Sequence, residues 1–306
     1  MQPLKGVTFK IMAVIFGIAM ASIVKTVSGT IPAGEIVFFR SFFAAPIIVG
    51  WLFFRGDLKS GLKTDNPMGH IWRGLIGTAA MALYFAGLKF LPLPEATAIG
   101  YTAPILVVIF AAMFLGETVG IYRLSAVVIG LIGVAIILGP KLTMQTANEN
   151  PTEMLGVMVA LGGAVCASLV QIYLRKLTQT ESTASIVFRF SLTASVLSLF
   201  TLYWGWVIPT PRELFLLVSA GIIGGGTQIF LTSSYRYADA SLVAPFEYTS
   251  MLLAIAVGYM VFDELPSQST VIGACVIIAA GVLIIYRERK LGIERTKQRK
   301  ASSQQA

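Results

Sequence analysis

The stretch Gly74-Leu75-Ile76-Gly77 returns as Gly221-Ile222-Ile223-Gly224, 147 residues further along the chain. Other pairs of residues recur at offsets between 146 and 149: Ala21-Ser22-Ile23-Val24 with Ala167-Ser168-Leu169-Val170, Arg40 with Arg189, Lys89 with Arg236, Tyr101 with Tyr248, Glu117 with Glu264, and Gly133-Val134 with Gly281-Val282. Any one pair would be weak evidence, but their nearly common offset indicates that the chain is a duplication of one unit.

The composition predicts a membrane protein. Of the 306 residues, 56% are hydrophobic and only 12% are charged, with a mean hydropathy of +0.79. Soluble domains carry about 25% charged residues, and disordered chains combine low hydrophobicity with high charge, so both classes are excluded. The two cysteines, Cys166 and Cys275, lie inside apolar runs. They therefore predict neither a disulfide framework nor a cysteine metal site.

Ten segments have the roughly 20 apolar residues that a helix needs to cross a bilayer. They are 6–26, 35–54, 71–90, 95–115, 120–139, 154–175, 183–203, 213–232, 239–261 and 269–286. Five segments in each unit make the second unit enter the membrane upside down, as in the inverted repeats of many secondary transporters. We therefore expect an all-α integral membrane protein with a first repeat at 6–139, a periplasmic linker at 140–153, a second repeat at 154–287 and a basic cytoplasmic tail at 288–306.

The distribution of positive charge predicts the orientation, because cytoplasmic loops carry an excess of Lys and Arg. A cytoplasmic N-terminus places 17 Lys and Arg residues inside and four outside, while Arg40 and Arg189 fall within spans. Both termini are then cytoplasmic, and the protein lies in the cell (inner) membrane. The net charge of +8 does not indicate nucleic-acid binding. The largest cluster of basic residues follows the last apolar segment, as is typical of a segment that contacts anionic lipids.

Two corresponding runs carry a family resemblance. The first is Leu93-Pro94-Glu95-Ala96-Thr97-Ala98 with Tyr101, Pro104 and Phe114-Leu115-Gly116-Glu117, and the second is Ala240-Ser241-Leu242-Val243-Ala244-Pro245 with Tyr248 and Phe262-Asp263-Glu264. On these motifs the chain resembles the EamA branch of the drug/metabolite transporter superfamily, from about residue 6 to 287. The resemblance implies ten helices in two EamA repeats and secondary transport. The second run departs from the first, with Pro245 inside the motif and Glu247 in place of Gly100.

The substrate is suggested by a narrower likeness. The run Glu35-Ile36-Val37-Phe38-Phe39-Arg40-Ser41-Phe42-Phe43, with Leu91-Pro92-Leu93-Pro94-Glu95-Ala96-Thr97, is similar to bacterial members that include riboflavin uptake proteins. Riboflavin uptake by alternating access is therefore the leading expectation. Related members are amino-acid exporters or S-adenosylmethionine uptake proteins, and both alternatives stay open. A channel and a lipid-modifying membrane enzyme are rival classes outside the family.

Charged and amide side chains within the apolar segments are the first candidates for substrate binding or gating. Arg40 and Arg189 lie inside spans, where a charge costs at least about 2.5–3.5 kcal/mol and usually faces a cavity or a partner. The alternative is that each arginine reaches a headgroup or clamps a neighbouring helix. Lys25 either reaches the interface or contacts substrate. Gln171 and Gln228 have no long apolar stem, so we expect them to point toward substrate or another helix.

Three further candidates lie around the two repeated motifs. Glu247 follows Pro245, and polar groups beside an interrupted helix bind substrate in many transporters. It is interpreted either as a proton-coupling acid or as the partner of an arginine. Tyr101 and Tyr248 occupy equivalent places near the middle of their spans. The pseudo-two-fold axis should bring them toward one central cavity, where they would suit a planar substrate.

Residues for catalysis or cofactor binding are sparse. The single histidine, His70, is expected in a cytoplasmic loop without a partner, and no GxxxxGK[ST] phosphate-binding sequence occurs. We therefore predict no enzyme activity, no metal and no cofactor. The expected partners are a small-molecule substrate and membrane lipids, and a homodimer is possible.

Overall fold

The computed structural model describes residues 3–54, 56, 63–64, 66–115, 121–141, 151–237, 244–283 and 286. Regular structure within them is entirely helical, as expected for an all-α protein. The elements are α1 (Pro3–Val27), α2 (Ala33–Phe54), α4 (Pro67–Phe90), α5 (Leu93–Gly100), α6 (Thr102–Leu115), α7 (Ile121–Leu138), η1 (Gly139–Lys141), α9 (Pro151–Thr180), α10 (Thr183–Leu199), η2 (Phe200–Trp204), α11 (Pro211–Tyr237), η3 (Ala244–Tyr248), α13 (Thr249–Phe262) and a last helix, Gln268–Leu283.

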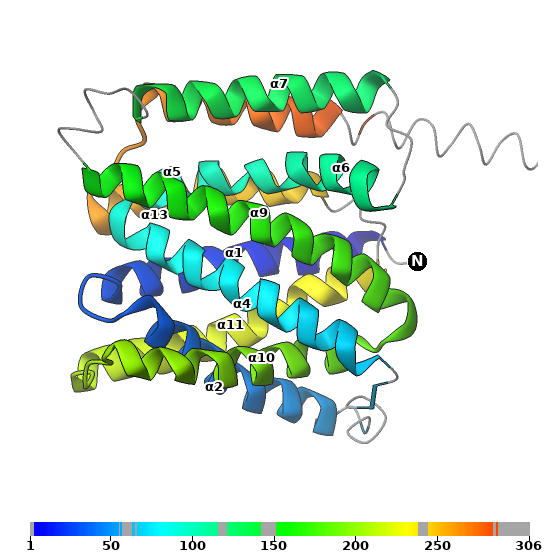
Figure 1. The fold of residues 1–306 in the computed structure, drawn as a ribbon, viewed down its shortest axis with the longest axis vertical. Helices are drawn as coiled ribbons and strands as arrows, with labels where there is room; N and C mark the ends of the chain where they lie inside the picture. Colours follow the sequence, from blue (N-terminus) through cyan, green and yellow to red (C-terminus); the bar gives the residue numbers. More distant parts are fainter. Residues whose placement is uncertain are drawn as a thin grey trace, which may run out of the picture.

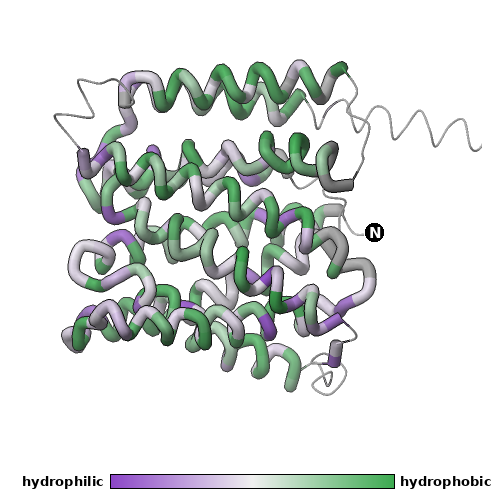
Figure 2. Tube along the Cα trace, in the orientation of Figure 1, coloured by the Kyte–Doolittle hydropathy of each residue, from purple (hydrophilic) through white to green (hydrophobic). Residues whose placement is uncertain are grey.

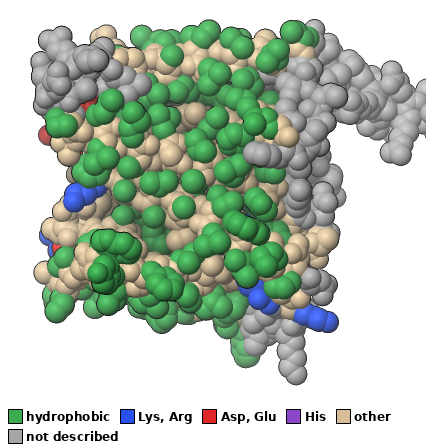
Figure 3. All heavy atoms as spheres, viewed as in Figure 1, with side chains coloured by type: hydrophobic (Ala, Val, Ile, Leu, Met, Phe, Trp, Pro, Cys, Tyr) green, Lys and Arg blue, Asp and Glu red, His purple; other side chains and the backbone are tan. Residues whose placement is uncertain are grey.

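The helices have the length and surface of membrane-spanning segments. Among the described residues, seven helical segments are long and apolar enough to cross a bilayer, and three apolar helices are shorter. Each of these helices overlaps one of the ten predicted segments, and the count of ten membrane spans stays a prediction. The helices lie side by side and are apolar along most of their length (Figures 1 and 2). Hydrophobic side chains also cover the face in Figure 3. An apolar exterior is typical of helices surrounded by lipid.

Two of the predicted spans are interrupted. The fourth is divided into α5 and α6 at Tyr101. In the ninth, the described residues begin with the 3₁₀ turn η3, and α13 follows from Thr249. Pro104 accounts for the first break, because its ring clashes with the carbonyl of Gly100, four residues earlier, and it has no N–H to donate. Residues 238–243, where the ninth predicted span begins, lie outside the described residues.

The helices of the two halves are interleaved. Helix α1 packs against α11, and α4 packs against α9, while α2 lies between α10 and α11 (Figure 1). Helix α7 and the last helix form one edge of the bundle. Gly133 and Gly273 permit that contact, since a Cβ on Gly133 would lie 2.8 Å from the carbonyl oxygen of Gly273. Most of the predicted linker at 140–153 and all of the basic tail at 288–306 lie outside the described residues.

Three residues that the sequence analysis counted on the cytoplasmic side are buried in the structure. Lys10 is buried within α1, and Arg73 is buried within α4. Both therefore lie in the interior of the bundle, and the side of the membrane to which each is nearer stays a prediction. The expectation for His70 was also wrong: it lies buried in the first turn of α4, with Nε2 3.4 Å from the Glu181 carboxylate. In each case tertiary packing supplies an environment that the local sequence does not reveal.

Candidate functional site

The two interrupted helices meet at the tyrosines that the repeat pairs. The rings of Tyr101 and Tyr248 pack edge to face, with centroids 5.4 Å apart. Tyr101 is buried, and its Oη lies 2.6 Å from Oγ of Ser250. Tyr248 is half-buried. The prediction that these residues approach one another is therefore matched by the geometry, although the ring of Tyr101 is occupied by protein contacts in this conformation. A substrate role for the pair stays a prediction.

Glu247 lies next to this contact and forms an ion pair across the bundle. Its carboxylate Oε2 accepts a hydrogen bond from Nζ of Lys10 in α1. The Lys10 side chain is only 2% exposed, whereas 46% of the Glu247 side chain remains exposed. Glu247 thus pairs with a lysine instead of the arginine considered from the sequence. The pair joins α1 to the 3₁₀ turn that opens the interrupted helix.

Arg40 lies beside Arg73, a residue that the sequence reasoning did not select. Arg40 comes from α2 and Arg73 from α4, and both guanidinium groups face the ring of Phe190 from α10. The two side chains are buried, and Nε and Nη1 of each have no hydrogen-bond partner among the described residues. This places two cations in the interior of the bundle without a carboxylate beside them in the described part of the chain.

Arg189 lies in a different environment from Arg40, its counterpart in the repeat. It is half-buried in α10, and its Nε donates to Oγ of Ser185. Nearby, Glu181 accepts hydrogen bonds from Thr64 Oγ1 at 2.7 Å and from the backbone N–H of Asn66 at 3.0 Å. These contacts connect the start of α4 to the turn between α9 and α10. The paired sequence positions therefore do not form one arginine pair in the structure.

Lys25 belongs to a polar cluster at the opposite end of α1 from Lys10. Its Nζ lies 3.0 Å from Oε1 of Glu264 and donates to the carbonyl oxygen of Leu91 at 2.7 Å. The other carboxylate oxygen of Glu264 accepts from the backbone N–H of Leu93 at 3.1 Å. The Lys25–Glu264 cluster denotes these two side chains with the Leu91 carbonyl and the Leu93 N–H. It connects the end of α1 to the α4–α5 junction and to the segment after α13.

The two glutamines differ in exposure. Gln171 is exposed on α9, and Gln228 is half-buried on α11. Neither is placed in the arginine or tyrosine groups described above. Their proposed contact with substrate or with another helix therefore remains a prediction.

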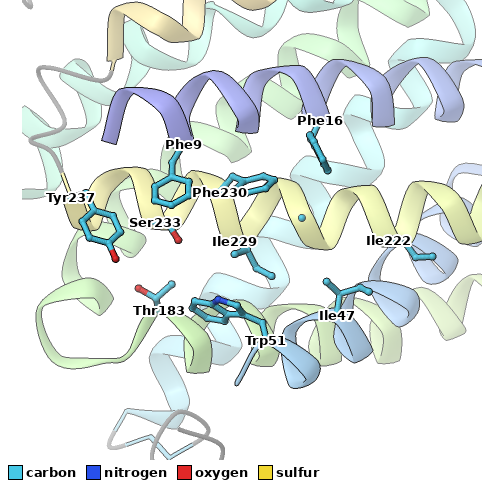
Figure 4. A pocket seen from close by; sticks show the side chains of 11 residues that line it. Phe9, Phe16, Ile47, Trp51, Thr183, Ile222, Ile229, Phe230, Ser233 and Tyr237 are labelled. Carbon is cyan, nitrogen blue, oxygen red and sulfur yellow. The ribbon is translucent and has the colours of Figure 1, made fainter. Parts of the chain in front are cut away.

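A cavity of about 520 Å³ lies along α11 (Figure 4). Its wall is mostly apolar, with side chains from α1, α2, α10 and α11. The residues are Phe9, Phe16, Ile47, Trp51, Thr183, Ile222, Gly226, Ile229, Phe230, Ser233 and Tyr237. Its volume falls in the range of small-molecule sites, about 300–1,000 Å³. Sequence reasoning missed this cavity, because aromatic residues in apolar segments look the same whether they face lipid or a hollow.

No group of three or more His, Cys, Asp or Glu side chains suited to a metal ion occurs among the described residues. The polar contacts between the described side chains include two lysine–glutamate pairs, the His70–Glu181 contact, the Tyr101–Ser250 hydrogen bond and the arginine pair. Lys10 and Arg73 were both missed as candidates. The signal available was the same one used for Arg40, a basic residue inside or at the edge of an apolar segment.

Apolar helices of membrane-spanning length, interrupted helices that meet inside the bundle and buried charges are features of multi-pass membrane transporters. The chain belongs to the EamA-like transporter family, which matches residues 4–139 and 154–287. The resemblance inferred from the motifs is thereby confirmed.

Individual relatives differ in the substrates that they are named for. An S-adenosylmethionine uptake transporter of Rickettsia felis is 32% identical over 256 residues, which is 84% of each chain. A pseudopaline exporter of Pseudomonas aeruginosa is 29% identical over 280 residues, covering 91% of this chain and 95% of its own. A riboflavin transporter of Rhizobium johnstonii is 30% identical over 233 residues, covering 76% of this chain and 74% of its own.

Proposed function

We propose that this protein is a secondary transporter of the inner membrane that takes up S-adenosylmethionine, or a close analogue, by alternating access. The observation that carries the mechanism is the contact of two interrupted helices at Tyr101 and Tyr248. Interrupted helices leave backbone groups free to bind substrate near the midplane. They also provide a point at which the two halves can move relative to each other.

The architecture proposed is ten helices in two inverted repeats, at 6–139 and 154–287, with both termini in the cytoplasm. The packing supports it. Helix α1 and α9 would open the two repeats, and α4 and α11 would be the third helices. The first helix of each repeat packs against the third helix of the other, in the pairs α1–α11 and α4–α9. Such reciprocal packing is what a pseudo-two-fold axis between inverted repeats produces.

The choice of substrate rests on the relatives and on the charges inside the bundle. The S-adenosylmethionine uptake relative shares more identity over more of the chain than the riboflavin transporter. S-adenosylmethionine carries a carboxylate and two cationic groups, and the bundle contains both Glu247 and buried arginines. Riboflavin is uncharged, so it would leave the buried arginines without an opposite charge. Riboflavin uptake, the leading expectation from the sequence, becomes the second candidate, and export of an amino-acid derivative is the third.

Uptake by vesicles containing the purified protein tests the proposal. Radiolabelled S-adenosylmethionine, riboflavin and a set of amino acids would be offered separately, with protein-free vesicles as the control. We expect saturable uptake of S-adenosylmethionine that excess unlabelled compound abolishes. Saturable uptake of riboflavin with none of S-adenosylmethionine would contradict the proposed substrate.

A further inference from the structure

The arginine pair, Arg40 and Arg73, is the most unusual electrostatic feature of the bundle. Arg40 is 3% exposed and Arg73 is 6% exposed. Their Cζ atoms lie 5.9 Å and 3.7 Å from the centroid of the Phe190 ring. Within the described part of the chain, neither forms an ion pair, and Nε and Nη1 of both lack a hydrogen-bond partner.

This arrangement is unfavourable without an anion. A buried cation loses its hydration, and the loss is recovered only when an opposite charge and hydrogen-bond acceptors replace the water. A second cation beside it adds repulsion. The face of Phe190 offers a cation–π contact, which recovers part of the cost, but it supplies no acceptor for the free N–H groups. The pair therefore has the donors and the charge to bind an anionic ligand.

Backbone space around the guanidinium groups is preserved by two glycines. A Cβ on Gly77 would lie 2.9 Å from Nη1 of Arg73, and a Cβ on Gly224 would lie 3.0 Å from Nε of Arg40. These glycines are the last residues of the two repeated Gly-x-x-Gly motifs, 147 positions apart. The duplication thus places one glycine against each arginine, although the arginines themselves are not repeat partners.

We propose that Arg40 and Arg73 together bind the carboxylate group of an amino-acid-like substrate. The inference rests on the proposed function, and it names the group of the substrate that this site takes. A carboxylate has two oxygens that accept several hydrogen bonds, and the planar guanidinium presents paired N–H donors that match it. Helices α2 and α4 supply one arginine each, so carboxylate binding would join these two helices through the substrate.

Paired compounds that differ only in the carboxylate test the assignment. S-adenosylmethionine would be compared with decarboxylated S-adenosylmethionine, and L-methionine with L-methioninol. The binding of each compound is measured by the rise in the thermal unfolding temperature of the purified protein as its concentration increases. The variants are Arg40→Gln and Arg73→Gln. The matched control is Arg212→Gln, which replaces an exposed arginine at the start of α11. We expect the carboxylated member of a pair to bind at least tenfold more tightly to the wild type and to the control, and the preference to disappear in both variants.

The two glutamine variants should fold, because each removes a buried charge that forms no ion pair within the described part of the chain, and their unfolding temperature without ligand should not fall. Equal binding of both members of a pair by the wild type, or a preference that persists in Arg40→Gln and Arg73→Gln, would overturn the assignment. Tighter binding of inorganic phosphate than of L-methionine would also overturn it. If S-adenosylmethionine is not transported but the L-methionine preference is present and lost in the variants, the proposed substrate fails and the carboxylate site stands.

Discussion

The contacts of the Lys25–Glu264 cluster predict a measurable energetic coupling between these two side chains. Their side chains are 11% and 24% exposed, so the 3.0 Å ion pair is largely shielded from solvent. Lys25→Met removes the charge and the donor to the Leu91 carbonyl, and leaves a carboxylate without its cation. Hydrogen bonds to charged groups contribute about 1.5–3 kcal/mol each, so we expect a loss of about 2–3 kcal/mol in the free energy of unfolding. Glu264→Gln keeps an acceptor for the Leu93 N–H and should cost about 1–2 kcal/mol.

The double variant separates the ion pair from the loss of each side chain. Once both charges are gone, no unpaired carboxylate remains, so the combined loss should fall short of the sum of the single losses by at least about 1 kcal/mol. Denaturant unfolding of the purified protein in mixed micelles measures all four free energies. Lys89→Met, at an exposed position in the same region of α4, is the control and should change little. If the loss in unfolding free energy of the double variant equals the sum of the two single losses, the Lys25–Glu264 pair does not stabilise the protein.

Two other predictions concern the topology and the tyrosine contact. A reporter fused after Ala306 should be cytoplasmic and one inserted at Gln145 should be periplasmic, and finding both on the same side would contradict the inverted repeats. Tyr101→Phe keeps the ring packed on Tyr248 but loses the 2.6 Å hydrogen bond to Ser250, so it should destabilise the protein by about 1 kcal/mol with a modest effect on transport. Tyr101→Ala should reduce transport at least tenfold more than Tyr101→Phe, and equal transport rates in the two variants would count against a role for the ring.

The elements that depend on local sequence were predictable. Runs of apolar residues predicted the positions of the helices, because a bilayer-spanning helix requires about 20 of them. The offset of 147 between Tyr101 and Tyr248 predicted that two residues distant in the chain would approach each other, and their rings are in contact. Motifs around these residues indicated the family that the match over both halves confirms.

The partners of the buried charges were not predictable in the same way. Arg40 was selected, but its neighbour Arg73 was counted with the cytoplasmic charges, since it lies near the start of the segment predicted at 71–90. Lys10 was counted there too, although Glu247 pairs with it from a segment 237 residues away. Such contacts depend on the rotation and depth of each helix, which are set by packing between helices and leave no mark in a single apolar run.

Counterflow in proteoliposomes tests the central claim, that the protein is a carrier of S-adenosylmethionine. Vesicles containing the protein would be loaded with unlabelled S-adenosylmethionine and diluted into a trace of the labelled compound. Alternating access predicts that label accumulates transiently above its equilibrium level, because internal substrate speeds the return of the binding site to the outside. No such overshoot should occur in protein-free vesicles. Entry of label that only approaches equilibrium, at a rate independent of the internal substrate, would contradict the account and indicate a channel.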